Sequence, residues 1–170
     1  MPRIGELKLP SDSIKVQTAK RAEWNEARSA QDAHFFTIGY SSRSLADFIS
    51  ALKSVEVVTV IDVRQYPVSM YRPEFSKRNL EASLNSAGIA YWHMPELGVP
   101  REVRSIAVET GSRNDIWDWY DSNVTFSLNT FFNVADHPLA LLCVELDPTA
   151  CHRHRLALSL EESGLRGYDL

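Results

Sequence analysis

The sequence predicts an α/β fold, a three-layer sandwich in which helices cover both faces of a mostly parallel sheet of four to five strands. Segments typical of strands and of helices alternate from residue 34 onward. Two strand segments, 55–63 and 138–146, are nearly continuous apolar runs, as expected for parallel strands buried on both faces. A chain of 170 residues with 44% hydrophobic residues has the size and composition of one globular domain.

Residues 1–33 are mostly polar and predict an N-terminal arm, and residues 34–170 predict the single α/β domain. Pro2, Gly5 and Pro10 interrupt the beginning of the arm, and residues 20–30 have the composition of a short helix around Trp24. We expect the arm to wrap around the domain.

The domain begins with a βαβ unit. Residues 34–40 are aromatic and β-branched and are interrupted at Gly39, which predicts a strand. Residues 45–54 have apolar side chains at helical spacing, and Ser42 or Ser44 can cap this helix. The apolar run 55–63 completes the unit as a second strand.

The remaining segments continue the alternation. After a loop (64–76), Ser76 is placed to cap a helix that ends at Gly88, and 89–94 is the next strand. Residues 96–114 predict a loop with one or two helical turns, and 115–135 fit two helices or one broken helix. Strand 138–146, a tight loop, a helix over 151–164 that ends at Gly164 and a short final strand complete the domain.

Composition and charge exclude several classes of protein. A net charge of −4 and a pI of about 5.7 argue against a surface devoted to nucleic acid, although they allow a local basic patch. No apolar run approaches the ~18 residues of a membrane span, so we expect no membrane partner. The N-terminus lacks the apolar core of a secretory signal, which favours a cytoplasmic protein. Two cysteines make no disulfide framework.

Parallel sheets bind ligands at the carboxyl ends of their strands, and four of the expected strand ends carry polar side chains. They are Gly39–Ser41, Asp62–Arg64, His93 and the segment from Glu145 to Arg153. In the last of them, Cys151 and His152 open a helix, whose free N–H groups and dipole favour anions and lower the pKa of a thiol. Both a thiolate nucleophile at Cys151 and a cysteine that packs at the helix start fit this setting.

Acidic and basic side chains also follow the strand 55–63. Asp62 and Arg64 share one face of the strand, so they either pair with each other or bind a ligand. Residues 64–78 carry four cations and one anion. A charge run is usually a solvated face, but this run flanks the expected cleft, so we expect Arg64 to contact an anion.

Spacing does not favour a zinc site. His152 and His154 point to different sides of one helix, so only Cys151 with His154, or His152 with a distant partner, could share an ion. The chain has no C-x-x-C and no H-x-x-x-H pair. Cys143 lies within an apolar run and is interpreted as a small core side chain. We therefore expect no required cofactor, and a divalent metal only where carboxylates bind it.

Together these motifs resemble the bacterial and archaeal domain-of-unknown-function family 488. The resemblance is carried by TIGYS (37–41), VIDVR (60–64), GIAYWH (88–93) and CVELDPTACHR (143–153), and it covers about residues 36–163. It implies a Rossmann-like α/β domain whose activity the family name does not define. The family's L-G-G turn reads Leu97-Gly98-Val99 here. The resemblance implies a candidate site made of Gly39, Tyr40, Ser41, Asp62, Arg64, Ser69, Glu145, Cys151, His152 and Arg153.

The leading hypothesis is an enzyme that acts on an anionic substrate containing a phosphate or nucleotide. Arg64, Arg153 and the start of the following helix would hold the anion. Asp62 or Glu145 would act as general acid or base, and Cys151 as nucleophile. The remaining candidates, Gly39, Tyr40, Ser41, Ser69 and His152, would contact the substrate.

Two alternatives compete with this hypothesis. In the first, Asp62, Glu145 and Asp147 bind magnesium for phosphoryl transfer or nucleic-acid cleavage. In the second, the protein is a non-catalytic module that senses a nucleotide or a partner and uses its N-terminal arm for the interaction. Nucleic-acid binding through residues 64–78 is less favoured, and the sequence predicts no oligomeric state.

Overall fold

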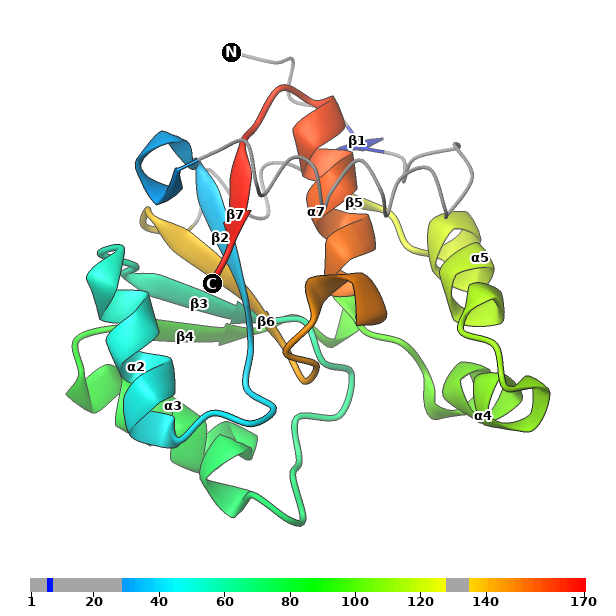
Figure 1. Cartoon of the computed structure of the whole chain (residues 1–170), viewed down its shortest axis with the longest axis horizontal. Coiled ribbons are helices and arrows are strands. Elements are labelled where there is room, and N and C mark those ends of the chain that lie inside the picture. The colour runs from blue at the N-terminus through cyan, green and yellow to red at the C-terminus, as the bar shows by residue number, and fades with distance from the viewer. Residues whose placement is uncertain (1–5, 8–28, 128–134) are drawn as a thin grey trace.

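The chain folds around one parallel β-sheet (Figure 1). The computed structural model describes residues 6–7, 29–127 and 135–170. The sheet contains five strands in the order β4-β3-β6-β2-β7, and every neighbouring pair is parallel. The strands are β2 (Phe35–Gly39), β3 (Thr59–Asp62), β4 (Ala90–His93), β6 (Leu139–Cys143) and β7 (Gly167–Asp169). The predicted parallel sheet is confirmed.

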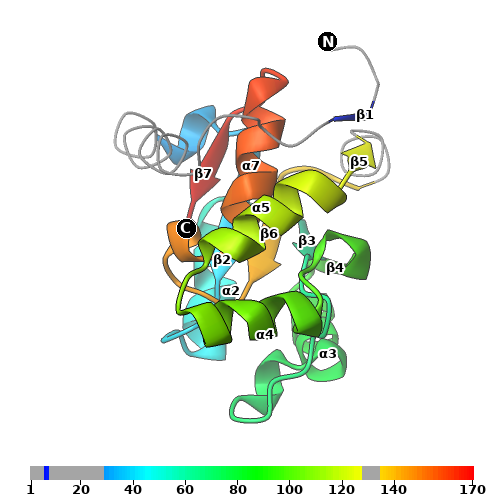
Figure 2. The same ribbon diagram turned by 90° about the vertical axis from the view of Figure 1, so that its right-hand side faces the viewer.

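Helices cover both faces of this sheet. On one face, α2 (Leu45–Ser54) and α3 (Lys77–Ser86) bury Phe48 and Leu80 in the same apolar cluster. On the other face, α5 (Asn114–Asn123) and α7 (Arg153–Glu162) bury Tyr120 and Leu156 in a second cluster. A further helix, α4 (Arg101–Thr110), packs against α5 beside this second face (Figure 2). The three-layer architecture is therefore confirmed.

The central strand β6 explains why both faces need a cover. Successive side chains of a strand point to opposite faces. Leu139 and Leu141 belong to the cluster under α5 and α7, whereas Ala140 and Leu142 belong to the cluster under α2 and α3. All four are fully buried, so the apolar run that predicted this strand reflects burial on both sides.

Several predicted helix ends are confirmed. The Ser44 hydroxyl caps α2 by accepting a hydrogen bond from the backbone N–H of Asp47 at 3.0 Å. Gly88, with φ +79°, follows the end of α3 in the left-handed conformation. Ser76 occupies the first position before α3, but its hydroxyl accepts from the backbone N–H of Ser69 at 3.0 Å instead of capping the helix. The preceding loop folds back on itself and uses that hydroxyl.

Other boundaries differ from the prediction. The strand expected over 55–63 shortens to β3, because the chain turns at Glu56, which has φ +58°. Residues 96–114 contain all of α4, which is longer than the expected turns. Only Val103 of this helix is buried. Short 3-10 turns occur at Ala30–Asp32, Pro73–Phe75, Pro95–Leu97 and Pro148–Ala150.

The part of the arm that the structure describes contains a short strand. β1 (Glu6–Leu7) pairs antiparallel with β5 (Phe126–Ser127), which follows α5. The helix expected around Trp24 lies outside the described residues, as does the end of the segment 115–135. Among the described residues, no helix combines the length and the apolarity that a membrane crossing requires.

Candidate active site

A cavity of about 250 Å³ opens at the carboxyl ends of the neighbouring strands β3 and β6. This is the edge of the sheet at which ligands of parallel α/β folds bind. Residues that follow the two strands, such as Arg64 and Glu145, line it together with Cys151 and side chains from α4 and α5. Val99, where the chain departs from the family's L-G-G turn, also contributes to the wall.

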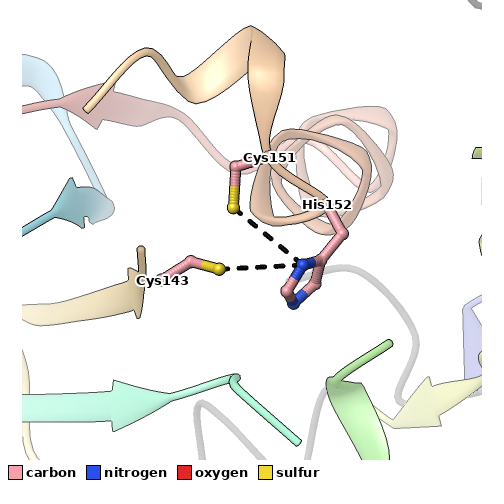
Figure 3. A group of neighbouring side chains, drawn as sticks. All are labelled: Cys143, Cys151 and His152. Carbon is pink, nitrogen blue, oxygen red and sulfur yellow. Dashed lines mark hydrogen bonds between the residues drawn. The ribbon is translucent and has the colours of Figure 1, made fainter. Parts of the chain in front are cut away.

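Two sulfurs and an imidazole meet in this cavity (Figure 3). The Nδ1 atom of His152 lies 3.7 Å from Sγ of Cys143 and 3.9 Å from Sγ of Cys151. The Nε2 atom of His152 lies 3.0 Å from the carbonyl oxygen of Val63. A carbonyl only accepts, so Nε2 carries a hydrogen and Nδ1 is the atom that faces both sulfurs. The three side chains are buried, and their ligand atoms lie within 4.8 Å of one another.

The surroundings make the two thiols unequal. Burial alone would raise the pKa of Cys151, but a hydrogen bond from the Cys143 thiol, the charge and hydrogen bond of His152 and the charge of Arg153 lower it well below the ordinary value. For Cys143, burial and the neighbouring Cys151 raise the pKa. Burial would lower the pKa of His152, but the negative charge of Cys151 raises it. The site thus favours a Cys151 thiolate beside a protonated His152 and a neutral Cys143.

Glu145 adds a carboxylate next to Cys143. Oε2 of Glu145 lies 3.7 Å from Sγ of Cys143, as a second acceptor within reach of the same thiol proton. Burial and the charge of Cys151 raise the pKa of Glu145 to about 7, so it can exchange a proton near neutral pH. Arg113 lies on the outer side, with Nη1 3.9 Å from Oε1 of Glu145. Arg113 is half exposed and also lines the cavity.

Asp62 and Arg64 form a buried pair. The carboxylate of Asp62 accepts hydrogen bonds from Nε of Arg64 at 2.8 Å, from Nη2 of Arg64 at 2.5 Å and from the Tyr91 hydroxyl at 2.5 Å. Nη1 of Arg64 donates to the carbonyl of Phe75 at 2.9 Å. Burial and the charge of Asp62 raise the pKa of Tyr91. Asp62 is not among the described residues that line the cavity, and the pair ties β3 to β4 and to the loop before α3.

Arg153 uses its guanidinium to hold the chain that leaves β6. Its Nη1 donates to the carbonyl of Glu145 at 2.6 Å, its Nη2 to that of Leu146 at 3.2 Å, and its Nε to the Thr37 hydroxyl at 3.2 Å. The guanidinium groups of Arg64 and Arg153 therefore both bind protein acceptors, and the anion contacts expected of them stay a prediction. Within the 64–78 segment, Arg72 likewise donates to the carbonyls of Tyr40 and Arg43.

The predicted residues after β2 hold strand ends together. A Cβ on Gly39 would lie 1.7 Å from the carbonyl oxygen of Glu145, so only glycine allows this approach. The Ser41 hydroxyl donates to the carbonyl of Val144 at 2.7 Å, and the Tyr40 ring stacks on Phe75 with centroids 4.5 Å apart. Gly39, Tyr40, Ser41 and Ser69 are not part of the cavity lining that the structure describes.

Sequence reasoning did not anticipate the role of Cys143. It is a core side chain, as interpreted, but it is also the last residue of β6, so its sulfur reaches the cavity. The neighbour that Cys151 and His152 find lies at the end of a strand, which spacing along one helix does not identify. Among the described residues, these three are the group with converging metal-ligand atoms. The carboxylates proposed for magnesium do not form such a group: Asp62 binds Arg64, and Asp147 caps Thr149.

Comparison with known proteins identifies a family but does not indicate a reaction. The family described as "Domain of unknown function DUF488" matches residues 44–160. No curated protein and no solved structure matches the chain.

Proposed function

This chain belongs to the domain-of-unknown-function family DUF488, and from the geometry of its site we propose that it is a thiol enzyme that acts on a small anionic molecule. Cys151 is the nucleophile, and its substrate occupies the cavity at the ends of β3 and β6. The observation that carries the proposal is the position of Cys151, which lines a cavity and whose sulfur lies 3.9 Å from the Nδ1 atom of His152.

His152 supports the thiolate in this proposal. Its Nε2–H is bound to a backbone carbonyl, so the ring is held with Nδ1 toward the sulfur. A nucleophilic thiol needs a cation or base at hydrogen-bond range, oriented by a third group. The Val63 carbonyl supplies that third group here, and it does so through the backbone.

Two exposed arginines support an anionic substrate. Arg104 and Arg113 line the cavity from the side of α4 and α5. Arg113 already donates to the Ala150 carbonyl and lies beside Glu145, so Arg104 is the first candidate for binding the anion. Ile116 and Trp117 add an apolar wall. A cavity of about 250 Å³ lies below the usual range for drug-sized ligands, which favours a molecule smaller than a nucleotide.

The test is the rate of alkylation at Cys151 as a function of pH, followed by peptide mass spectrometry with Cys143 as internal control. We expect a midpoint for Cys151 well below the ~8.5 of a free thiol and a slower reaction at Cys143. An ordinary midpoint at Cys151 would contradict the proposal.

Anion preference is measured with two reagents that differ in charge. The ratio of the Cys151 rates with iodoacetate and with iodoacetamide should fall in the Arg104→Gln variant. The matched control is Arg78→Gln, which removes an exposed arginine outside the cavity lining that the structure describes. If the ratio of the iodoacetate and iodoacetamide rates were the same in the two variants, the anion-binding role of Arg104 would be contradicted.

A further inference from the structure

The chain has two cysteines, and the fold brings their sulfurs into one cavity. Cys143 ends β6, and Cys151 lies eight positions later, just before α7. Their sulfur atoms lie within 4.8 Å of each other, and both face the Nδ1 atom of His152 from the same side (Figure 3). The nucleophile of the proposed function therefore has a second thiol within reach. A reaction that uses one thiol, such as alkylation or acyl transfer, does not need Cys143.

We propose that Cys143 and Cys151 are a redox couple that reduces a small anionic disulfide, with Cys151 as the attacking and Cys143 as the resolving thiol. The inference rests on the proposed function and names its substrate class. Three observations carry it: the approach of the two sulfurs, the contact of Cys143 with Glu145, and the presence of both cysteines in the lining of the same cavity.

The reaction balances in two exchange steps. The Cys151 thiolate attacks one sulfur of the substrate disulfide, and the electron pair of that bond leaves on the first product thiolate. Cys143 then transfers its proton to Glu145 and attacks the Cys151 sulfur, which releases the second product thiolate and forms the Cys143–Cys151 disulfide. The substrate gains the two electrons that the protein dithiol loses. An external dithiol returns the protein to its reduced form by the same exchange.

Each side chain of the cluster has one task in this scheme. Cys151 is the thiol whose surroundings favour the thiolate, which makes it the attacking group. Cys143 stays protonated until the second step, and Oε2 of Glu145, 3.7 Å from its sulfur, is the acceptor for its proton. His152 faces both sulfurs and stabilises whichever of them carries the negative charge.

The experiment uses the reduced full-length chain and dithiobis(nitrobenzoate), an aromatic disulfide with two carboxylates. Released thionitrobenzoate is followed by absorbance, and the product by intact mass. We expect the wild type to release two equivalents and to end lighter by two hydrogens, as an intramolecular disulfide. Because the chain has no other cysteine, that product identifies the pair.

Three variants separate the steps. Cys143→Ser should release one equivalent and keep the mixed disulfide on Cys151. Cys151→Ser should react at least about tenfold more slowly, because the remaining thiol is mostly protonated. Glu145→Gln should slow the second release, which is the ring-closing step.

Two results would overturn the inference. If the wild type ends with one or two mixed disulfides and no ring, the two cysteines are not a couple, although a reactive Cys151 would still support the proposed function. If the purified chain carries stoichiometric zinc, and its thiols react only after a chelator removes the metal, the cluster is a metal site. A Cys151 that stays unreactive in metal-free, folded protein would contradict the proposed function itself.

Discussion

Replacing Asp62 by alanine should destabilise the domain more than any other single change to a charged residue of the sheet. Asp62 is fully buried and Arg64 is 4% exposed. Without the carboxylate, the guanidinium keeps its bond to Phe75 but loses both bonds to Asp62, and the Tyr91 hydroxyl loses its acceptor. Leaving one charge of a buried pair uncompensated costs about 3–5 kcal/mol. The whole free energy of unfolding of a natural protein is only about 5–15 kcal/mol, so this loss is a large part of it.

The assay is urea unfolding, with wild type and variants compared at one pH. Asp62→Ala should lower the free energy of unfolding by about 3–5 kcal/mol. The double variant Asp62→Leu with Arg64→Met removes both charges and should recover most of that loss, because apolar replacements of buried pairs are often neutral. A loss below about 1 kcal/mol for Asp62→Ala, or no recovery in the double variant, would refute the reasoning. Folded Asp62→Asn protein should keep its Cys151 reactivity, because Asp62 serves the fold and not the cavity.

Three further predictions concern single contacts. Gly39→Ala should lower the free energy of unfolding, measured in urea, by about 3 kcal/mol or more, because the new Cβ would lie 1.7 Å from the carbonyl oxygen of Glu145. Tyr91→Phe should cost about 1.5–3 kcal/mol in the same assay, the usual contribution of a hydrogen bond to a charged group. Folding raises the pKa of Glu145 from 4.5 to about 7, so its carboxylate opposes folding increasingly as pH rises through that range. The free energy of unfolding of Glu145→Gln, measured relative to wild type, should therefore increase from about pH 5 to about pH 8. If this difference did not change with pH, the prediction would be contradicted. The titratable or charged groups that face Glu145 are Cys143, Cys151, His152 and Arg113.

The fold was predictable because burial on two faces leaves a strong pattern. The run that contains β6 has no polar side chain from Leu139 to Cys143, which is typical of a central parallel strand. Helix α4 was less predictable, because it buries one residue and exposes Val108 at 84%.

The sequence predicted where the site lies, but not which side chains contact one another there. The edge of the sheet follows from strand direction, and Cys151 with His152 follows from the start of a helix. Whether Arg64 binds a ligand or Asp62 depends on side-chain geometry that spacing alone does not determine. The contribution of Cys143 depends on the residue at which β6 ends, and an apolar run does not mark its last residue.

The reactive cluster has a consequence for how this domain tolerates change. All of its side chains come from one continuous stretch, residues 143–152, and the contact to a distant strand is made to a backbone oxygen, that of Val63. A backbone carbonyl is present whatever the side chain. Substitution of the Val63 side chain therefore leaves this contact to the cluster in place, provided that β3 keeps its register. An insertion between Cys143 and Cys151 would have the opposite effect, because the length of that one loop determines how closely the sulfurs approach.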